Sequence, residues 1–176
     1  QELINLSEKK ELDIDIKVLI TNKDEAGCIK RAKNVDIPHK IIRGIDFPQK
    51  KLFELEIINT LMHYDVELIV MAGWMKIVTP FFINKFKNKI INIHPSLLPA
   101  YKGGSAIKDA ILSGSKITGC SVHFVEEEVD SGSLIMQAAL PILNEDTIDT
   151  LSKKIQILEH KILPRSISYV GYLIRS

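Results

Sequence analysis

The sequence predicts an α/β protein with a doubly wound, mostly parallel sheet, to which a late hairpin adds antiparallel strands. Two observations support this fold class. Short apolar or β-branched runs alternate with segments of helical periodicity, as they do in βαβ units. From Thr118 the pattern changes to a two-residue alternation between the faces of a strand, which is typical of a hairpin.

The first part of the chain predicts two helices and two strands. Residues 1–11 carry leucines and an isoleucine among charges, which favours an amphipathic helix. Residues 14–21 form a β-branched run and predict a strand. The following Asn22-Lys23-Asp24 predicts the N-cap of a helix that ends near Asn34. Residues 39–42, after Pro38, predict a short strand.

The middle of the chain continues this alternation. Residues 50–64 predict a helix, and residues 67–72 predict a buried strand that ends at Gly73. Pro80 opens a short helix, and residues 89–93 predict the next strand. The apolar side of the helix over residues 50–64 is expected to consist of Leu52, Leu55, Ile58, Leu61 and Met62.

The last part predicts a helix, the hairpin and a closing helix. Residues 105–112 are helical and stop at Gly114. Two strands, from Thr118 onward and over 133–142, flank a turn at Asp130-Ser131-Gly132. A closing helix runs from Thr147 to about Leu163, and Pro164 is expected to interrupt it before a final helical segment.

Length and composition indicate one domain over residues 1–176, large enough to bury roughly 70% of its unfolded surface. A net charge of +1 gives no field that favours nucleic acid. No apolar run reaches the ~18 residues that a membrane helix needs. Cys28 and Cys120 are too few for a disulfide framework or a metal site, so we expect a cytoplasmic protein without a metal.

Polar residues at the ends of two predicted strands indicate a site. Ligands in open α/β sheets bind beyond the carboxyl ends of the strands. Asn92 ends an apolar strand, where an amide needs partners, and His94 is held by the proline that follows it. Asp130 alone is a good turn residue, and His123 alone is a packing or supporting residue. Together with Asn92 and His94, however, Asp130 could accept and release a proton near a polarised carbonyl.

Three motifs carry a family resemblance that covers nearly the whole chain. They are Asn92-Ile93-His94-Pro95-Ser96-Leu97-Leu98-Pro99, then Gly119-Cys120-Ser121-Val122-His123-Phe124-Val125, then Asp130-Ser131-Gly132 with Ile135-Met136-Gln137. In this order they closely resemble the folate-dependent glycinamide ribonucleotide formyltransferases. The resemblance implies a Rossmann-like domain that transfers the formyl group of 10-formyltetrahydrofolate to the amine of glycinamide ribonucleotide, in purine biosynthesis.

The resemblance also implies roles for individual residues. The catalytic Asn, His and Asp of the family fall on Asn92, His94 and Asp130. The residues expected to contact the folate are Met75, Lys76, Ile77, Val78, Asn92, Glu126, Glu127, Glu128, Val129 and Lys50. The residues expected to hold the ribose are Gln156 and Glu159. The expected partners are glycinamide ribonucleotide and the formyl folate, without nucleic acid or membrane. The protein is expected to be a monomer or a homodimer.

The chain departs from the family pattern at three places. It starts at Gln1, after the first strand and the glycine-rich phosphate loop of the family, and a missing N-terminal segment is the expected reason. A family arginine is replaced by lysine at Lys50 or Lys51, and lysine lacks the bidentate fork. The loop from Tyr101 to Ser105 lacks histidines that some members carry.

Two other functions stay open at this point. A 10-formyltetrahydrofolate hydrolase would use the same Asn92, His94 and Asp130 but transfer the formyl group to water. A non-catalytic folate-binding protein could keep the fold, although the intact residues weigh against it. A methionyl-tRNA formyltransferase needs a second, basic domain and is less favoured.

Overall fold

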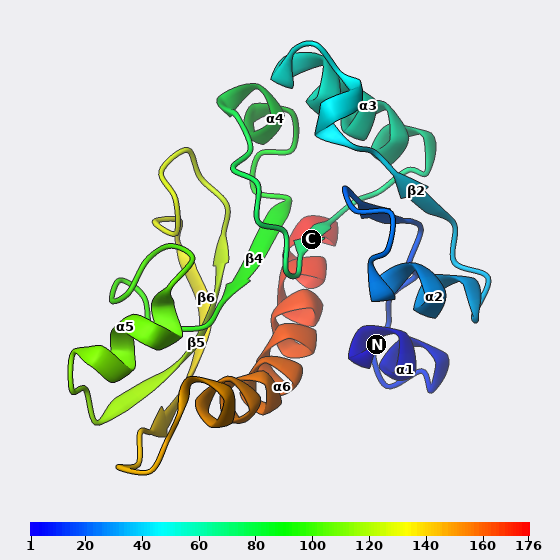
Figure 1. The fold of residues 1–176 in the computed structure, drawn as a ribbon. Helices are drawn as coiled ribbons and strands as arrows, with labels where there is room; N and C mark the ends of the chain where they lie inside the picture. The colour runs from blue at the N-terminus through cyan, green and yellow to red at the C-terminus, as the bar shows by residue number, and fades with distance from the viewer. The chain divides into compact units, whose positions relative to one another are not determined.

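The computed structural model describes residues 1–176, which separate into two compact units, residues 1–67 and residues 68–176. The two units are described one at a time. Figure 1 labels most of their helices and strands. No helix in either unit combines the length and the hydropathy needed to cross a membrane.

The first unit is a small α/β arrangement around two parallel strands. Strand β1 pairs with β2 in parallel, with Leu19 opposite His39. Its elements are α1 (Glu2–Glu8), β1 (Leu19–Thr21), α2 (Gly27–Lys33), β2 (His39–Ile41), the 3₁₀ helix η1 (Gly44–Asp46) and α3 (Lys50–His63).

Two local predictions for this unit are wrong. Helix α2 begins at Gly27 after Ala26, which makes no side-chain cap, so Asn22-Lys23-Asp24 is not its N-cap. Instead, the Thr21 Oγ1 accepts a hydrogen bond of 3.2 Å from the Lys23 N–H. A threonine that closes a turn on the backbone two residues later competes with helix initiation at that point, and the helix therefore starts later.

The buried face of α3 also differs from the predicted stripe. Leu52, Leu55 and Met62 are exposed, whereas Ile58 and Leu61 are buried as expected. The remaining buried side chains of this helix are Phe53, Glu54, Ile57 and Thr60. Leucines lie on both sides of α3, so spacing alone does not decide which side packs. The bulky Phe53, which contacts Phe47 edge to face at 5.9 Å, lies on the buried side.

The second unit is a four-stranded mixed sheet in the order β3-β4-β5-β6, with helices packed on it. Strands β3 and β4 are parallel, and β4–β5 and β5–β6 are antiparallel. The elements are β3 (Ile69–Met71), α4 (Pro80–Lys85), β4 (Ile90–His94), α5 (Ala106–Leu112), β5 (Ile117–Phe124), β6 (Leu134–Pro141) and α6 (Ile148–Arg175). The α/β class, the hairpin and the closing helix are thus confirmed.

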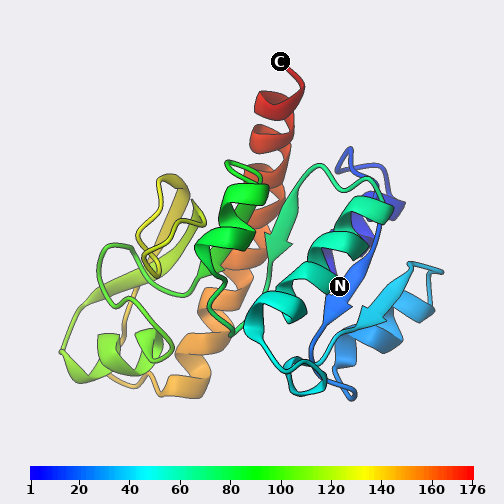
Figure 2. The same cartoon turned by 90° about the horizontal axis from the view of Figure 1, so that it is seen from above.

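The closing helix contains its proline instead of ending there. Helix α6 is 28 residues long, runs through Pro164 and packs against β5 and β6 (Figure 2). The predicted interruption is therefore wrong. A proline inside a helix costs about 3 kcal/mol, but Ile167 and Val170 beyond it are buried. Burying two such side chains contributes about 3–6 kcal/mol, which offsets the loss.

One buried hydroxyl fastens the segment after β4 to the hairpin. Ser121 Oγ on β5 donates to the Ser96 carbonyl at 2.7 Å and accepts from the Leu98 N–H at 3.0 Å. It also accepts from the Gln137 Nε2 of β6 at 2.8 Å, and the same Nε2 donates to the Leu98 carbonyl at 3.0 Å. The segment is thus bound at three points to two strands.

Replacing Ser121 by alanine is expected to lower the free energy of unfolding by about 1–3 kcal/mol, because buried backbone groups of Ser96 and Leu98 lose their partner. Urea denaturation followed by circular dichroism measures the change. Ser105→Ala is the matched control, since Ser105 precedes α5 without a side-chain capping bond. An unchanged midpoint for Ser121→Ala would contradict the role given to this hydroxyl.

Candidate active site

The three residues expected to be catalytic lie together in the second unit. Asn92 and His94 occupy the carboxyl end of β4, and Asp130 lies on the connection between β5 and β6. The His94 Nδ1 is 3.4 Å from the Asp130 Oδ2, and only 6% and 10% of these side chains are exposed. Residues 36 positions apart in the sequence therefore form a buried imidazole–carboxylate pair.

Backbone groups hold the carboxylate of Asp130 in place. The Gly103 N–H donates to its Oδ2 at 2.8 Å. Asp130 has a φ of +50°, and the next residue, Ser131, donates from its hydroxyl to the Glu128 carbonyl at 2.7 Å. Aspartate tolerates the left-handed region better than most residues, so the turn fits the residue type found there.

The ring of His94 is fixed from its other side. Its Nε2 lies 2.8 Å from the Tyr101 carbonyl, which can only accept, so this nitrogen carries a proton. The Nδ1 faces the Asp130 carboxylate. Both ring nitrogens therefore lie next to oxygen acceptors. The bond of Nε2 is short, whereas the 3.4 Å between Nδ1 and the Asp130 Oδ2 exceeds the usual N–H···O range, so Nδ1 is the nitrogen left to act on a third group.

His123, which the sequence indicated only as a packing or supporting residue, completes the cluster from β5. Its Nε2 lies 3.3 Å from the Asn92 Nδ2 and 3.6 Å from the Asp130 Oδ1. Burial lowers the pKa of His123. The sequence motif over residues 119–125 predicted the strand that carries His123. Only the pairing of β4 with β5 places its ring opposite Asn92.

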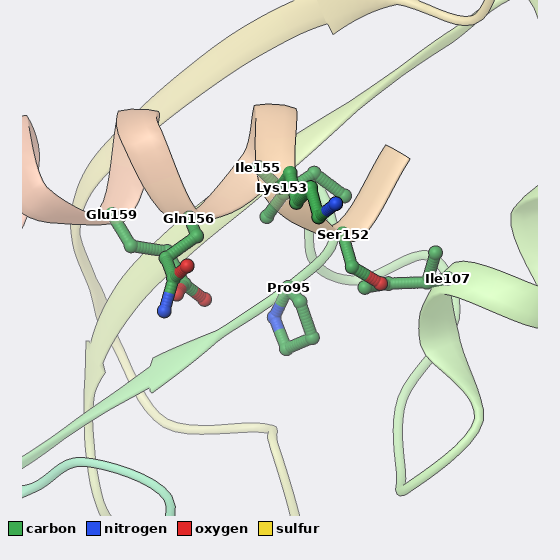
Figure 3. A pocket seen from close by; sticks show the side chains of 7 residues that line it. All are labelled: Pro95, Ile107, Ser152, Lys153, Ile155, Gln156 and Glu159. Carbon is green, nitrogen blue, oxygen red and sulfur yellow. The ribbon is translucent and has the colours of Figure 1, made fainter. Parts of the chain in front are cut away.

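A cavity of about 310 Å³ lies between the first turns of α6 and Pro95, the residue that follows His94 (Figure 3). It contains both residues that the resemblance assigned to the ribose, Gln156 and Glu159 of α6, and they lie near Pro95. The remaining lining residues are Ile107, Ser152, Lys153 and Ile155. Burial raises the pKa of Glu159, while His160 and His94 act in the opposite direction. A carboxyl group that holds its proton can both donate to and accept from sugar hydroxyls.

Apart from Asn92, the residues expected to contact folate belong to three separate segments of the chain. Met75 and Ile77, on the loop between β3 and α4, expose 77% and 61% of their area. Lys76 is exposed and Val78 is half-buried on the same loop, and Glu126, Glu127, Glu128 and Val129 are exposed on the β5–β6 connection. Lys50 is the first residue of α3, in the first unit. Within the second unit, no hydrogen bond or ion pair joins the residues of these two loops to the side chains of Asn92, His94 or Asp130.

Neither the Ser96 hydroxyl nor the Cys120 thiol is available as a nucleophile, because the first is hydrogen-bonded and the second is buried. Ser96 Oγ donates to the Ala100 carbonyl. Burial raises the pKa of Cys120 to about 12, with a smaller effect of Glu159 in the same direction. This thiol has no exposed surface and stays protonated at neutral pH, so it is not an activated nucleophile. No group of three or more His, Cys, Asp or Glu side chains has the arrangement of a metal site.

The comparisons with known proteins agree on one family. The model of the family described as Formyl transferase matches residues 1–167. The phosphoribosylglycinamide formyltransferase of Bacillus subtilis (strain 168) is 36% identical over 95% of this chain and 86% of its own length. The trifunctional purine biosynthetic protein adenosine-3 of Chironomus tentans is 39% identical over 98% of this chain. This chain spans 13% of that relative's length.

Solved structures give the same result. The phosphoribosylglycinamide formyltransferase of Bacillus halodurans has a TM-score of 0.93 and 36% identity, and the match covers 96% of this chain and 87% of that one. The phosphoribosylglycinamide formyltransferase of Coxiella burnetii has a TM-score of 0.90 and 40% identity, over 95% of this chain and 79% of that one.

Gly132 allows the turn that carries Asp130 to close. A Cβ at this position would lie 1.8 Å from the Phe124 carbonyl oxygen, which is part of the backbone. The chain cannot accept any side chain there without moving. Because Gly132 is two residues after Asp130, such a movement would displace the carboxylate.

Gly132→Ala is therefore expected to lower the stability by at least about 1 kcal/mol, as overpacking does, and to lower turnover as well. Thermal unfolding and steady-state kinetics measure the two effects. Gly104→Ala is the matched control, since the nearest heavy atom to a Cβ there is 3.8 Å away. Equal stability and turnover in Gly132→Ala and the wild type would show that the turn does not need glycine.

Proposed function

The chain belongs to the formyl transferase family, and we propose that it transfers the formyl group of 10-formyltetrahydrofolate to the amine of glycinamide ribonucleotide. The observation that carries this proposal is the buried pair of His94 and Asp130 beside Asn92, at the carboxyl end of β4. The Bacillus subtilis relative, whose name states this formyl transfer, supports the choice of acceptor. Purine biosynthesis is the corresponding process.

In the proposed reaction the substrate amine attacks the formyl carbon directly. Negative charge then develops on the formyl oxygen, and hydrogen-bond donors held near it lower the barrier. Asn92 supplies one amide N–H. His94 supplies Nδ1–H, because its Nε2 is bonded to the Tyr101 carbonyl. Each well-placed donor of this kind contributes about 3–4 kcal/mol.

Asp130 offsets positive charge on the His94 ring and accepts the proton of the attacking amine. Its carboxylate lies 3.4 Å from the His94 Nδ1, so it offsets positive charge that builds up on the ring during the reaction. As the carbon–nitrogen bond to the amine forms, the amine becomes acidic, and Asp130 accepts its proton directly or through water. The proton then passes to the departing folate nitrogen as the old carbon–nitrogen bond breaks. No covalent enzyme intermediate is needed.

The substrates are assigned to two regions. We assign the ribose to the cavity with Gln156 and Glu159, and the folate to the exposed loops that carry Met75, Lys76, Ile77 and Val78 and Glu126 to Val129. Lys50 is proposed as a further folate contact. Apolar side chains exposed on a loop, such as Met75 and Ile77, are suited to the flat face of a pterin ring.

We also propose that residues 1–176 form a single formyltransferase domain. The family match, which runs through both compact units to residue 167, supports this.

Absorbance-monitored folate turnover, with and without glycinamide ribonucleotide, tests the proposal. Turnover that requires the amine and yields its formyl derivative is the expected result. Turnover without the amine would replace the proposal by a 10-formyltetrahydrofolate hydrolase. Folate binding without any turnover would replace it by a folate-binding protein.

His94→Ala and Asp130→Ala are each expected to lower kcat by roughly 10² to 10⁴-fold, the usual contribution of general acid–base groups. Tetrahydrofolate binding, measured by fluorescence, should change little, because neither group is assigned to the pterin. His63→Ala and Asp149→Ala, at exposed positions on α3 and α6, are the matched controls. Near-normal turnover in either test variant would remove that residue from the mechanism.

A further inference from the structure

We propose that His123 is a positioning residue, whose neutral ring with the proton on Nδ1 orients the amide of Asn92 toward the reacting carbonyl. This inference rests on the proposed function for its effect on catalysis, but its geometry stands on its own. His123 has 2% of its area exposed, on β5, and lies directly opposite Asn92 in the β4–β5 pairing.

The hydrogen bonds of the ring assign its tautomer. The His123 Nδ1 lies 2.8 Å from the Phe124 carbonyl oxygen. A carbonyl oxygen only accepts, so Nδ1 carries the hydrogen. The Nε2 lies 3.3 Å from the Asn92 Nδ2, which only donates. In the neutral ring the unprotonated Nε2 accepts this bond, and both contacts are satisfied together.

The surroundings of His123 support the neutral form. Burial lowers its pKa, and the charge of His94 on β4 acts in the same direction. The Phe124 carbonyl and the carboxylates of Asp130 and Glu126 act in the opposite direction, more weakly than burial. The Asp130 Oδ1 is 3.6 Å from Nε2, beyond hydrogen-bond distance. The lone pair of Nε2 is thus left for Asn92.

This bond determines what Asn92 can do. An asparagine amide has two N–H donors and one carbonyl, and its terminal torsion is soft. When one N–H is fixed on the His123 Nε2, the plane of the amide is set, and the second N–H has a defined direction. A donor held before the reaction needs no reorganisation when negative charge appears on the formyl oxygen.

Three variants of His123 separate its two hydrogen bonds. In His123→Gln the amide oxygen can reach the place of Nε2 and accept from Asn92. In His123→Asn the amide nitrogen can donate to the Phe124 carbonyl, but the shorter side chain does not reach Asn92. His123→Phe keeps a ring and removes both bonds.

We expect kcat to fall about 10- to 100-fold in His123→Phe and His123→Asn, less than the 10² to 10³-fold loss on removing an oxyanion donor. His123→Gln should recover most of this loss. The KM for 10-formyltetrahydrofolate should change little, because the effect is on the transition state. Thermal unfolding identifies any variant whose kcat is lower only because the folded protein is less stable.

A double-mutant cycle with Asn92→Ala distinguishes positioning from a general structural role. If His123 acts through Asn92, then His123→Phe changes kcat by less than about threefold when Asn92 is already alanine. An equal loss in both backgrounds would overturn the proposal. So would a His123→Gln variant as impaired as His123→Phe.

The tautomer itself is measured without any substrate. A two-bond nitrogen–proton correlation spectrum of the ¹⁵N-labelled protein at neutral pH should show His123 with a protonated Nδ1 and a bare Nε2. A protonated Nε2 would overturn the proposal. A wild-type chain that transfers no formyl group, yet shows this tautomer, would refute the proposed function and leave the hydrogen-bond assignment confirmed.

Discussion

The antiparallel register between β4 and β5 determines which side chains meet at the site. It places Asn92 opposite His123 and His94 opposite Ser121. Because side chains alternate along a strand, a slip of one residue would turn each of these groups to the other face of the sheet. The buried Ile90 and Ile91 at the start of β4, and the fully buried Val122 on β5, oppose such a slip by packing.

The site is built from polar groups that are buried and yet have partners. His94, Ser96, Ser121 and His123 are each at most 5% exposed, and each makes at least one hydrogen bond. Burying such groups without partners would cost several kcal/mol. With its partners in place, Ser121 holds the segment that follows β4, and the bond from the His94 Nε2 to the Tyr101 carbonyl orients the ring of His94. Rigidity of this kind is what a preorganised site requires.

The sequence predicted the parts of the site that local chemistry marks and missed those that depend on pairing. An amide and an imidazole at the end of an apolar strand, followed by a proline, are visible in residues 92–95, and the family motif adds Asp130. His123 has no local signal, because its importance comes from the residue across the sheet. The predicted helix interruption at Pro164 was wrong for the same reason, since the burial of Ile167 and Val170 beyond it depends on tertiary packing. At Thr21, a local side-chain bond to the backbone displaced the predicted start of α2.

The pair of His94 and Asp130 is held by one short loop, and by its backbone rather than its side chains. The carbonyl of Tyr101 accepts from the His94 Nε2, and two residues later the N–H of Gly103 donates to the Asp130 Oδ2. Tyr101 and Gly103 both have positive φ, at 55° and 88°, and this conformation turns the carbonyl and the N–H toward the two partners. A change in the loop's conformation must therefore move both members of the pair together. The side chain of Lys102 between them is exposed and pairs with Glu128, so its identity can vary while the backbone keeps the imidazole and the carboxylate in contact.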